Sequence, residues 1–248
     1  MLRSILFGGL MLAAASAASG QTPRPSVGGI GSPPDAMIFY VAHGRADACG
    51  PGCSDWIAAE GTVQWDTHKR LFNILDRTAG RKLPLVIHSW GESNLSVATT
   101  LGRILRERGV DTTAGTTLVE ACNGRSEPEC FALKRPGGPL NAGIASQYAP
   151  CDFACVLILA GGIHRTLPAG TRVVLTGMLL RNRLAPNVSQ EARDTLPERY
   201  GEQLRKYLHD MGVETELLDI VDAQGESRRG IEMPASEWVR LRIVTPSR

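Results

Sequence analysis

The segment Pro84-Leu-Val-Ile-His88 and the residues that follow it decide the fold class. The segment is a short, continuously apolar run of the kind found in buried parallel strands. Ser93 can then cap a helix, an apolar face follows at helical spacing, and Gly109 supplies a stop signal. Strand character resumes at residues 116–119. This strand–helix–strand order predicts a βαβ unit, and therefore an α/β protein with parallel strands.

Further elements are predicted on both sides of this unit. In chain order they are a strand at 36–42, a helix from Thr67 to Gly80, an apolar helix near 154–160, a strand at 172–175, and an amphipathic helical stretch at 190–211 that breaks near Pro197. Residues 121–150 show no periodic pattern and are expected to be irregular.

The amino terminus has the pattern of an export signal. Residues 1–20 combine Arg3, an apolar stretch of about 11 residues and an Ala-Ser-Ala cleavage site. Such a stretch is too short to cross a hydrocarbon core of roughly 30 Å. Residues 21–35 are rich in Pro and Gly and read as a flexible linker. We therefore expect a periplasmic or secreted protein that does not span the membrane.

Composition narrows the function classes further. The mature chain of about 230 residues fits one α/β domain, with or without a small appendage. A net charge of +2, with the charged residues dispersed along the chain, provides no basic stripe for nucleic acid. We therefore expect no nucleic-acid partner.

Six cysteines occur in three close pairs, which are Cys49/Cys53, Cys122/Cys130 and Cys151/Cys155. In an exported protein this pattern indicates disulfides, and local pairing is the simplest of several connectivities. Metal binding is the alternative, because His43 lies near the first pair. The spacing matches no standard zinc site, so we expect neither a metal nor a cofactor.

One cysteine pair frames the most informative segment of the chain, Cys151-Asp-Phe-Ala-Cys155, which runs into an apolar helix and then Gly161-Gly162. Together with blocks at 49–61, 83–89 and 101–108, it resembles exported relatives of the Clp-protease/crotonase superfamily. The resemblance implies a ββα superhelix over residues 36–185 and a C-terminal helical appendage over residues 186–248.

The same resemblance implies a degenerate active site. In those relatives the pattern reads Cys-x-Ser-Ala-Cys, and Phe153 replaces the nucleophilic serine. The position of the base histidine falls on Thr176, which cannot act as a general base near neutral pH. The implied oxyanion donors are the backbone N–H of Ala154 and the turn at Gly91 and Glu92, where Glu92 replaces a glycine.

A protein of this kind is expected to bind rather than to catalyse. The resemblance implies a cleft for an unknown peptide or acyl-type ligand, without a cofactor. It also implies a capacity to form homo-oligomers.

A serine hydrolase remains the alternative. The run Ile87-His88-Ser89-Trp90-Gly91 is close to the nucleophile elbow of α/β-hydrolases, Gly-x-Ser-x-Gly, with Ile87 replacing the first glycine. His43-Gly44 resembles an oxyanion segment, and His209 is the candidate triad histidine. Ser89 would then be the nucleophile. His164 is expected to cap a helix or contact solvent.

Overall fold

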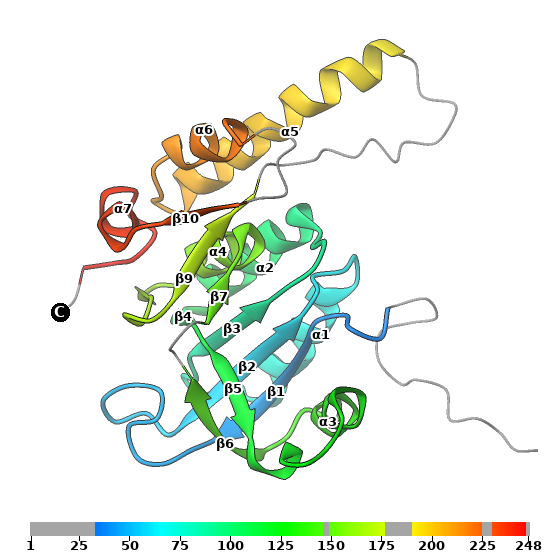
Figure 1. Cartoon of the computed structure of the whole chain (residues 1–248), viewed down its shortest axis with the longest axis vertical. Coiled ribbons are helices and arrows are strands. Elements are labelled where there is room, and N and C mark those ends of the chain that lie inside the picture. Colours follow the sequence, from blue (N-terminus) through cyan, green and yellow to red (C-terminus); the bar gives the residue numbers. More distant parts are fainter. Residues whose placement is uncertain (1–32, 146–148, 177–189, 225–229, 247–248) are drawn as a thin grey trace, which may run out of the picture.

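The computed structural model describes residues 33–145, 149–176, 190–224 and 230–246. The expected signal peptide and most of the expected linker lie outside these ranges. Two sheets form the framework (Figure 1). The larger sheet has seven strands in the order β5-β6-β1-β2-β3-β4-β8, and the smaller has the order β10-β9-β7. The expected α/β class is confirmed.

The strands of the large sheet are β1 (Ile38–His43), β2 (Asp55–Gly61), β3 (Leu85–Ser89), β4 (Thr112–Ala114), β5 (Thr116–Val119), β6 (Leu140–Ala145) and β8 (Arg165–Thr166). The small sheet contains β7 (Pro150–Cys151), β9 (Arg172–Leu175) and β10 (Ile231–Met233). The helices are α1 (Thr67–Arg77), α2 (Leu95–Arg108), α3 (Glu127–Lys134), α4 (Phe153–Ala160), α5 (Gln190–Asp210), α6 (Glu216–Asp222) and α7 (Ala235–Arg240), with a short 3-10 turn η1 (Glu120–Cys122).

The large sheet contains both parallel and antiparallel strands. The strand that pairs with β3 is not the one expected from the sequence. Strands β2, β3, β4 and β8 are parallel, whereas β1 runs antiparallel to β2. The parallel partner of β3 across α2 is β4, not the strand expected at 116–119. That segment forms β5, which pairs antiparallel with β6. β4 has only three residues, two of them threonine, so it carries no apolar pattern that would reveal it.

Three further expectations are corrected. Residues 121–150 contain α3 and β6 and are not irregular. Ser126 and Glu129 form a capping box at the start of α3, a local signal that the sequence does contain. The N-cap of α2 is Asn94, whose side chain accepts from the Val97 N–H at 3.1 Å. α5 is a single helix through position 197.

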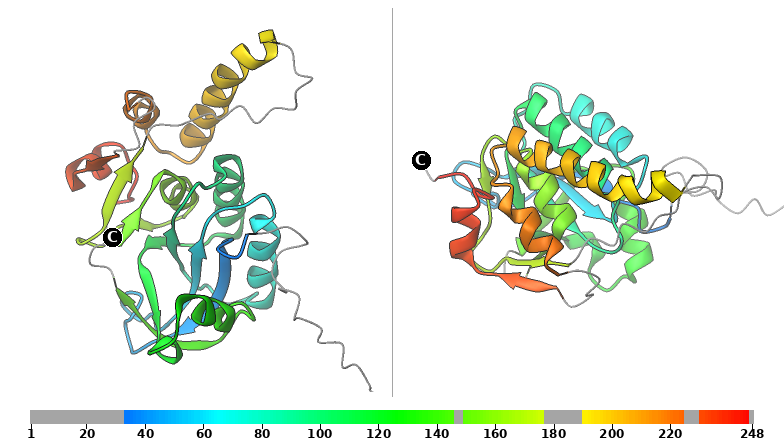
Figure 2. Two further views of the ribbon diagram at one scale, coloured as in Figure 1. Left: turned by 45° about the vertical axis from the view of Figure 1, so that its right-hand side comes forward. Right: turned by 90° about the horizontal axis from the view of Figure 1, so that it is seen from above.

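Helices cover one face of the large sheet. α1, α2 and α4 lie on this face (Figure 2). They pack against the side chains of Phe39, Ile57 and Ile87. The opposite face is formed by side chains such as Tyr40, Trp56 and Val86. Although β5 and β6 belong to the same sheet, β5 also contacts β3, so that this pair and α3 together cover that face. Both faces of the central strands are therefore buried, which explains the continuous apolar runs in the sequence.

The C-terminal helices share the main core. Leu204, Tyr207 and Leu208 of α5 belong to the same hydrophobic cluster as α2 and α4. The Tyr207 hydroxyl donates to the Leu157 carbonyl at 2.6 Å. Trp238, Leu241 and Ile243, which the sequence marks as apolar, are also buried in this cluster. No helix in the described ranges is both long and apolar enough to cross a membrane.

The three cysteine pairs form three local disulfides, Cys49–Cys53, Cys122–Cys130 and Cys151–Cys155. The expected local connectivity is therefore confirmed. Disulfides are stable in oxidising compartments, which is consistent with export.

Arg165 of β8 connects the core to the C-terminal helices. Its buried guanidinium donates to the carbonyls of Met211 and Arg242 at 2.8 Å and of Ile243 at 3.0 Å. These carbonyls follow the C-terminal ends of α5 and α7, where helix dipoles concentrate negative charge. Burial, with the charge of Arg106 as a smaller cause, lowers the pKa of Arg165 to about 10. Arg165 is still protonated at neutral pH.

We predict that Arg165→Met lowers the free energy of unfolding by about 3 kcal/mol, because several buried carbonyls lose a charged donor. Urea unfolding at pH 7 measures this change. The control is Arg205→Met, which removes an exposed ion pair with Asp219 and should cost less than about 1 kcal/mol. Equal losses in the two variants would contradict the role assigned to Arg165.

Candidate functional site

The end of β3 meets the start of α4. Ser89, the last residue of β3, is almost completely buried, and its hydroxyl lies 2.5 Å from Oδ1 of Asp152. The same carboxylate oxygen accepts the Cys155 N–H at 2.8 Å, so Asp152 is also the N-cap of α4. The structure therefore brings together the two segments that the sequence singles out.

The first turn of α4 carries no nucleophile. Phe153 and Ala154 are its first two residues, and both side chains are buried in the main core. The first N–H groups of a helix have no partner within the helix and favour negative charge. Here the Asp152 carboxylate already supplies that charge. An oxyanion at Ala154 would therefore form close to a carboxylate.

The turn after β3 has the backbone conformation that a glycine allows. Gly91 has a φ of +73°, and a Cβ there would lie 2.8 Å from Oγ1 of Thr62. Both Gly91 and Glu92 are exposed. Trp90 is half-buried, with its ring in edge contact with the rings of His88 at 4.9 Å and Phe131 at 6.4 Å.

Thr176 follows β9, which lies beside the strand that leads into α4. Val173 of β9 pairs with Cys151 of β7, so the two chain segments are neighbours. The Thr176 side chain is exposed. Among the described residues, neither Ser89 nor Asp152 forms a hydrogen bond with Thr176.

The histidines considered in the alternative reading contact acidic partners elsewhere. Nδ1 of His43 lies 2.5 Å from Asp55, and Nδ1 of His164 lies 2.8 Å from Asp111. The exposed His209 lies 3.9 Å from its neighbour Asp210. Ser89 has a regular strand conformation and donates to an acid rather than to a histidine.

The sequence reasoning missed a second polar cluster on the opposite face of the sheet. Glu60 is buried, accepts from the Tyr40 hydroxyl at 2.7 Å, and pairs with Lys134 of α3 at 2.5 Å. His88 is the strand partner of Glu60, so the two side chains lie on the same face. A glutamate within the apolar run of β2 was the available signal, since buried charges require partners.

The electrostatics of this cluster follow from burial. Burial raises the pKa of Tyr40, and the neighbouring Glu60 raises it further, so the phenol stays protonated. Burial lowers the pKa of His88, Glu60 and Asp152 raise it, and Lys134 lowers it, with burial the largest of these effects. His88 is therefore neutral at pH 7.

We predict that Lys134→Met costs about 3 kcal/mol of unfolding free energy, because it leaves Glu60 buried without its cation. The double variant Glu60→Gln/Lys134→Met should recover part of this loss. As a control, Arg172→Met removes an exposed ion pair with Glu232 and should cost less than about 1 kcal/mol. Chemical denaturation measures all three, and a loss below 1 kcal/mol for Lys134→Met would argue against a tight pair.

We predict that His88 makes stability depend on pH. Unfolded imidazole takes up a proton below about pH 6.5, whereas folded His88 resists protonation because its pKa is lowered. The stability contribution of neutral His88 is therefore complete above that pH and is lost as the pH falls. Wild type should lose more unfolding free energy than His88→Gln between about pH 7.5 and 5.5. Identical pH dependence in both proteins would contradict this prediction.

Comparisons with protein-family models, with curated proteins and with solved structures found no match. Within the described ranges, no group of three or more His, Cys, Asp or Glu side chains converges on a position that could hold a metal ion. The function must therefore be argued from the geometry of Ser89, Asp152 and Phe153 and from the surfaces around them.

Proposed function

We propose that this is an exported, non-catalytic protein of the Clp-protease/crotonase type, which binds a peptide or acyl-type ligand at a degenerate serine-hydrolase site. The observation that carries the proposal is the junction of β3 and α4. A phenyl ring occupies the first position of α4, and a carboxylate occupies the space beside its first N–H groups.

Each step of serine catalysis lacks a group in this arrangement. Phe153 has no atom that can attack a carbonyl. Ser89 has a hydroxyl, but its proton is donated to Asp152, and the residue is buried. A carboxylate can remove a proton from serine only poorly near neutral pH, because its pKa lies far below that of the hydroxyl. The negative charge of Asp152 also opposes an oxyanion at Ala154.

Binding is compatible with the same geometry. The exposed Gly91 turn and the half-buried Trp90 lie at the carboxyl end of β3, an edge where ligands commonly bind in α/β folds. An extended or acyl group can be bound there by apolar contact and backbone hydrogen bonds without a nucleophile.

Homo-oligomer formation remains part of the proposal. The second candidate function is hydrolysis through Ser89, whose hydroxyl lies at the carboxyl end of β3.

A fluorophosphonate probe distinguishes binding from hydrolysis. We predict no adduct on Ser89 in the oxidised mature protein, because the hydroxyl is buried and no histidine among the described residues forms a hydrogen bond with it. Phe153→Ser alone should also remain inactive toward activated esters, because Thr176 does not replace the base. Mass spectrometry of the labelled peptides measures the first result, and ester turnover measures the second.

Two outcomes would overturn the proposal. A stoichiometric adduct on Ser89 that is lost in Ser89→Ala would establish a serine hydrolase. For binding, N-acetyl peptide amides should shift the backbone amide signals of Gly91 and Ala154 in NMR spectra. Absence of any such shift at about 10 mM peptide, the range of very weak binding, would exclude this site for ligands of that class.

A further inference from the structure

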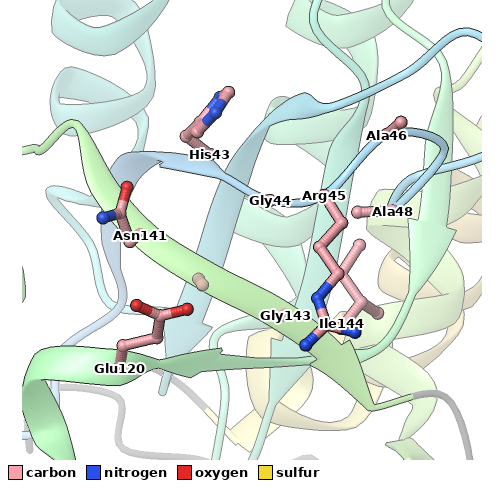
Figure 3. A pocket seen from close by; sticks show the side chains of 10 residues that line it. His43, Gly44, Arg45, Ala46, Ala48, Glu120, Asn141, Gly143 and Ile144 are labelled. Atoms are coloured by element: carbon pink, nitrogen blue, oxygen red, sulfur yellow. The ribbon is translucent and has the colours of Figure 1, made fainter.

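A cavity lies at the other end of the central strands, away from Ser89. Its volume is about 740 Å³, within the range of small-molecule sites. Its lining comes from the end of β1, the loop at 44–48, η1 and β6 (Figure 3). His43 at its edge pairs with Asp55 at the start of β2, whereas Ser89 pairs with Gly61 at the end of β2. At about 3.3 Å per residue, the two locations are roughly 20 Å apart.

The floor of this cavity is open because of Gly143. A Cβ built on Gly143 would have no atom within 4 Å. Gly143 faces the same side of the β5–β6 pair as its strand partner Leu118, whose side chain is 56% exposed. Asn141, two residues earlier in β6, faces this side as well. The floor thus combines an empty position and an amide.

Two opposite charges line the cavity without partners. Arg45 reaches over β6 beside Gly143, and Glu120 points toward the same strand from η1 (Figure 3). Within the described part of the chain, the side chains of Arg45 and Glu120 form neither a hydrogen bond nor an ion pair. A ligand with complementary charges could therefore satisfy both side chains without breaking an existing interaction.

The loop that carries Arg45 is fixed in position. The Gly44 N–H donates to the Ser54 carbonyl at 2.8 Å, and the Cys49–Cys53 disulfide closes the loop tip. A Cβ on Gly44 would approach the Ala142 carbonyl oxygen to 2.9 Å, so the loop packs directly on β6. The walls are thus preformed, which reduces the entropy cost of binding.

We infer that this cavity binds a short zwitterionic peptide, with its carboxylate on Arg45 and its ammonium group toward Glu120. A guanidinium binds a carboxylate through two parallel hydrogen bonds, and a carboxylate accepts from an ammonium. Asn141 can bond a peptide amide between the two ends. This site does not depend on the proposed function at Ser89 and Phe153.

Trialanine is a suitable probe for NMR titration of the ¹⁵N-labelled mature protein. We expect saturable shifts at the amides of Arg45 and Gly143, whatever the response of Gly91 and Ala154, which report on the first site. N-acetyl-trialanine and trialanine amide should each bind at least about tenfold more weakly, since each loses one charged contact. In Arg45→Ala, trialanine and trialanine amide should bind equally, because the group that recognises the carboxylate is gone.

Gly143→Leu is the decisive variant. It fills the open floor, and because Gly143 does not need a positive φ, the fold should keep its thermal midpoint. Trialanine binding should be lost. Lys69→Ala is the matched control for Arg45→Ala, because it also removes an exposed cation, here from α1. This variant should bind trialanine as wild type does.

The inference is overturned by any of three results. These are no saturable shift at about 10 mM trialanine, unchanged binding to Gly143→Leu, or equal affinity for the free and end-blocked peptides in wild type. Because Gly91 and Ala154 report separately on the first site, failure at one site is distinguishable from failure at the other.

Discussion

The Asp152 carboxylate is the interaction on which the central arrangement depends. One of its oxygens accepts both the Ser89 hydroxyl and the Cys155 N–H, and so joins the last residue of β3 to the first turn of α4. A charge-assisted hydrogen bond of this kind is stronger than a neutral one. Both donor residues, Ser89 and Cys155, are buried, where the lower dielectric strengthens the bond. The same bond that orders the junction also engages the hydroxyl of Ser89.

Charges buried on the two faces of the molecule are satisfied in different ways. On one face of the large sheet, Glu60 has a cation, Lys134, and a phenol, Tyr40. At β8, Arg165 is surrounded by backbone carbonyls near the ends of helices. The first arrangement fixes α3 over the sheet, and the second fixes the C-terminal helices onto the core. In both places the loss of one partner leaves the other desolvated, so the two contacts hold distant segments in register.

Two regions of the molecule enter the functional proposals. We propose that the Ser89–Phe153 junction corresponds to the active-site position of the proposed family, with Phe153 in place of the serine. In the cavity beside Gly143, the proposed binding site has a preformed wall and two opposite charges that have no partner among the described residues. Both features support the proposal that this chain recognises peptide-like ligands.

The sequence by itself determined the α/β class, the principal helices, the local disulfides and the absence of a serine at position 153. These properties depend on periodicity, caps and short spacings, which are local. Only the tertiary structure decided that β4 rather than β5 lies beside β3, because three residues carry too little pattern to compete with a longer run. It also decided that Ser89 meets Asp152 and that Lys134 meets Glu60, contacts separated by 63 and 74 residues. Such pairs form only when the whole chain closes around one core, and no local pattern specifies them.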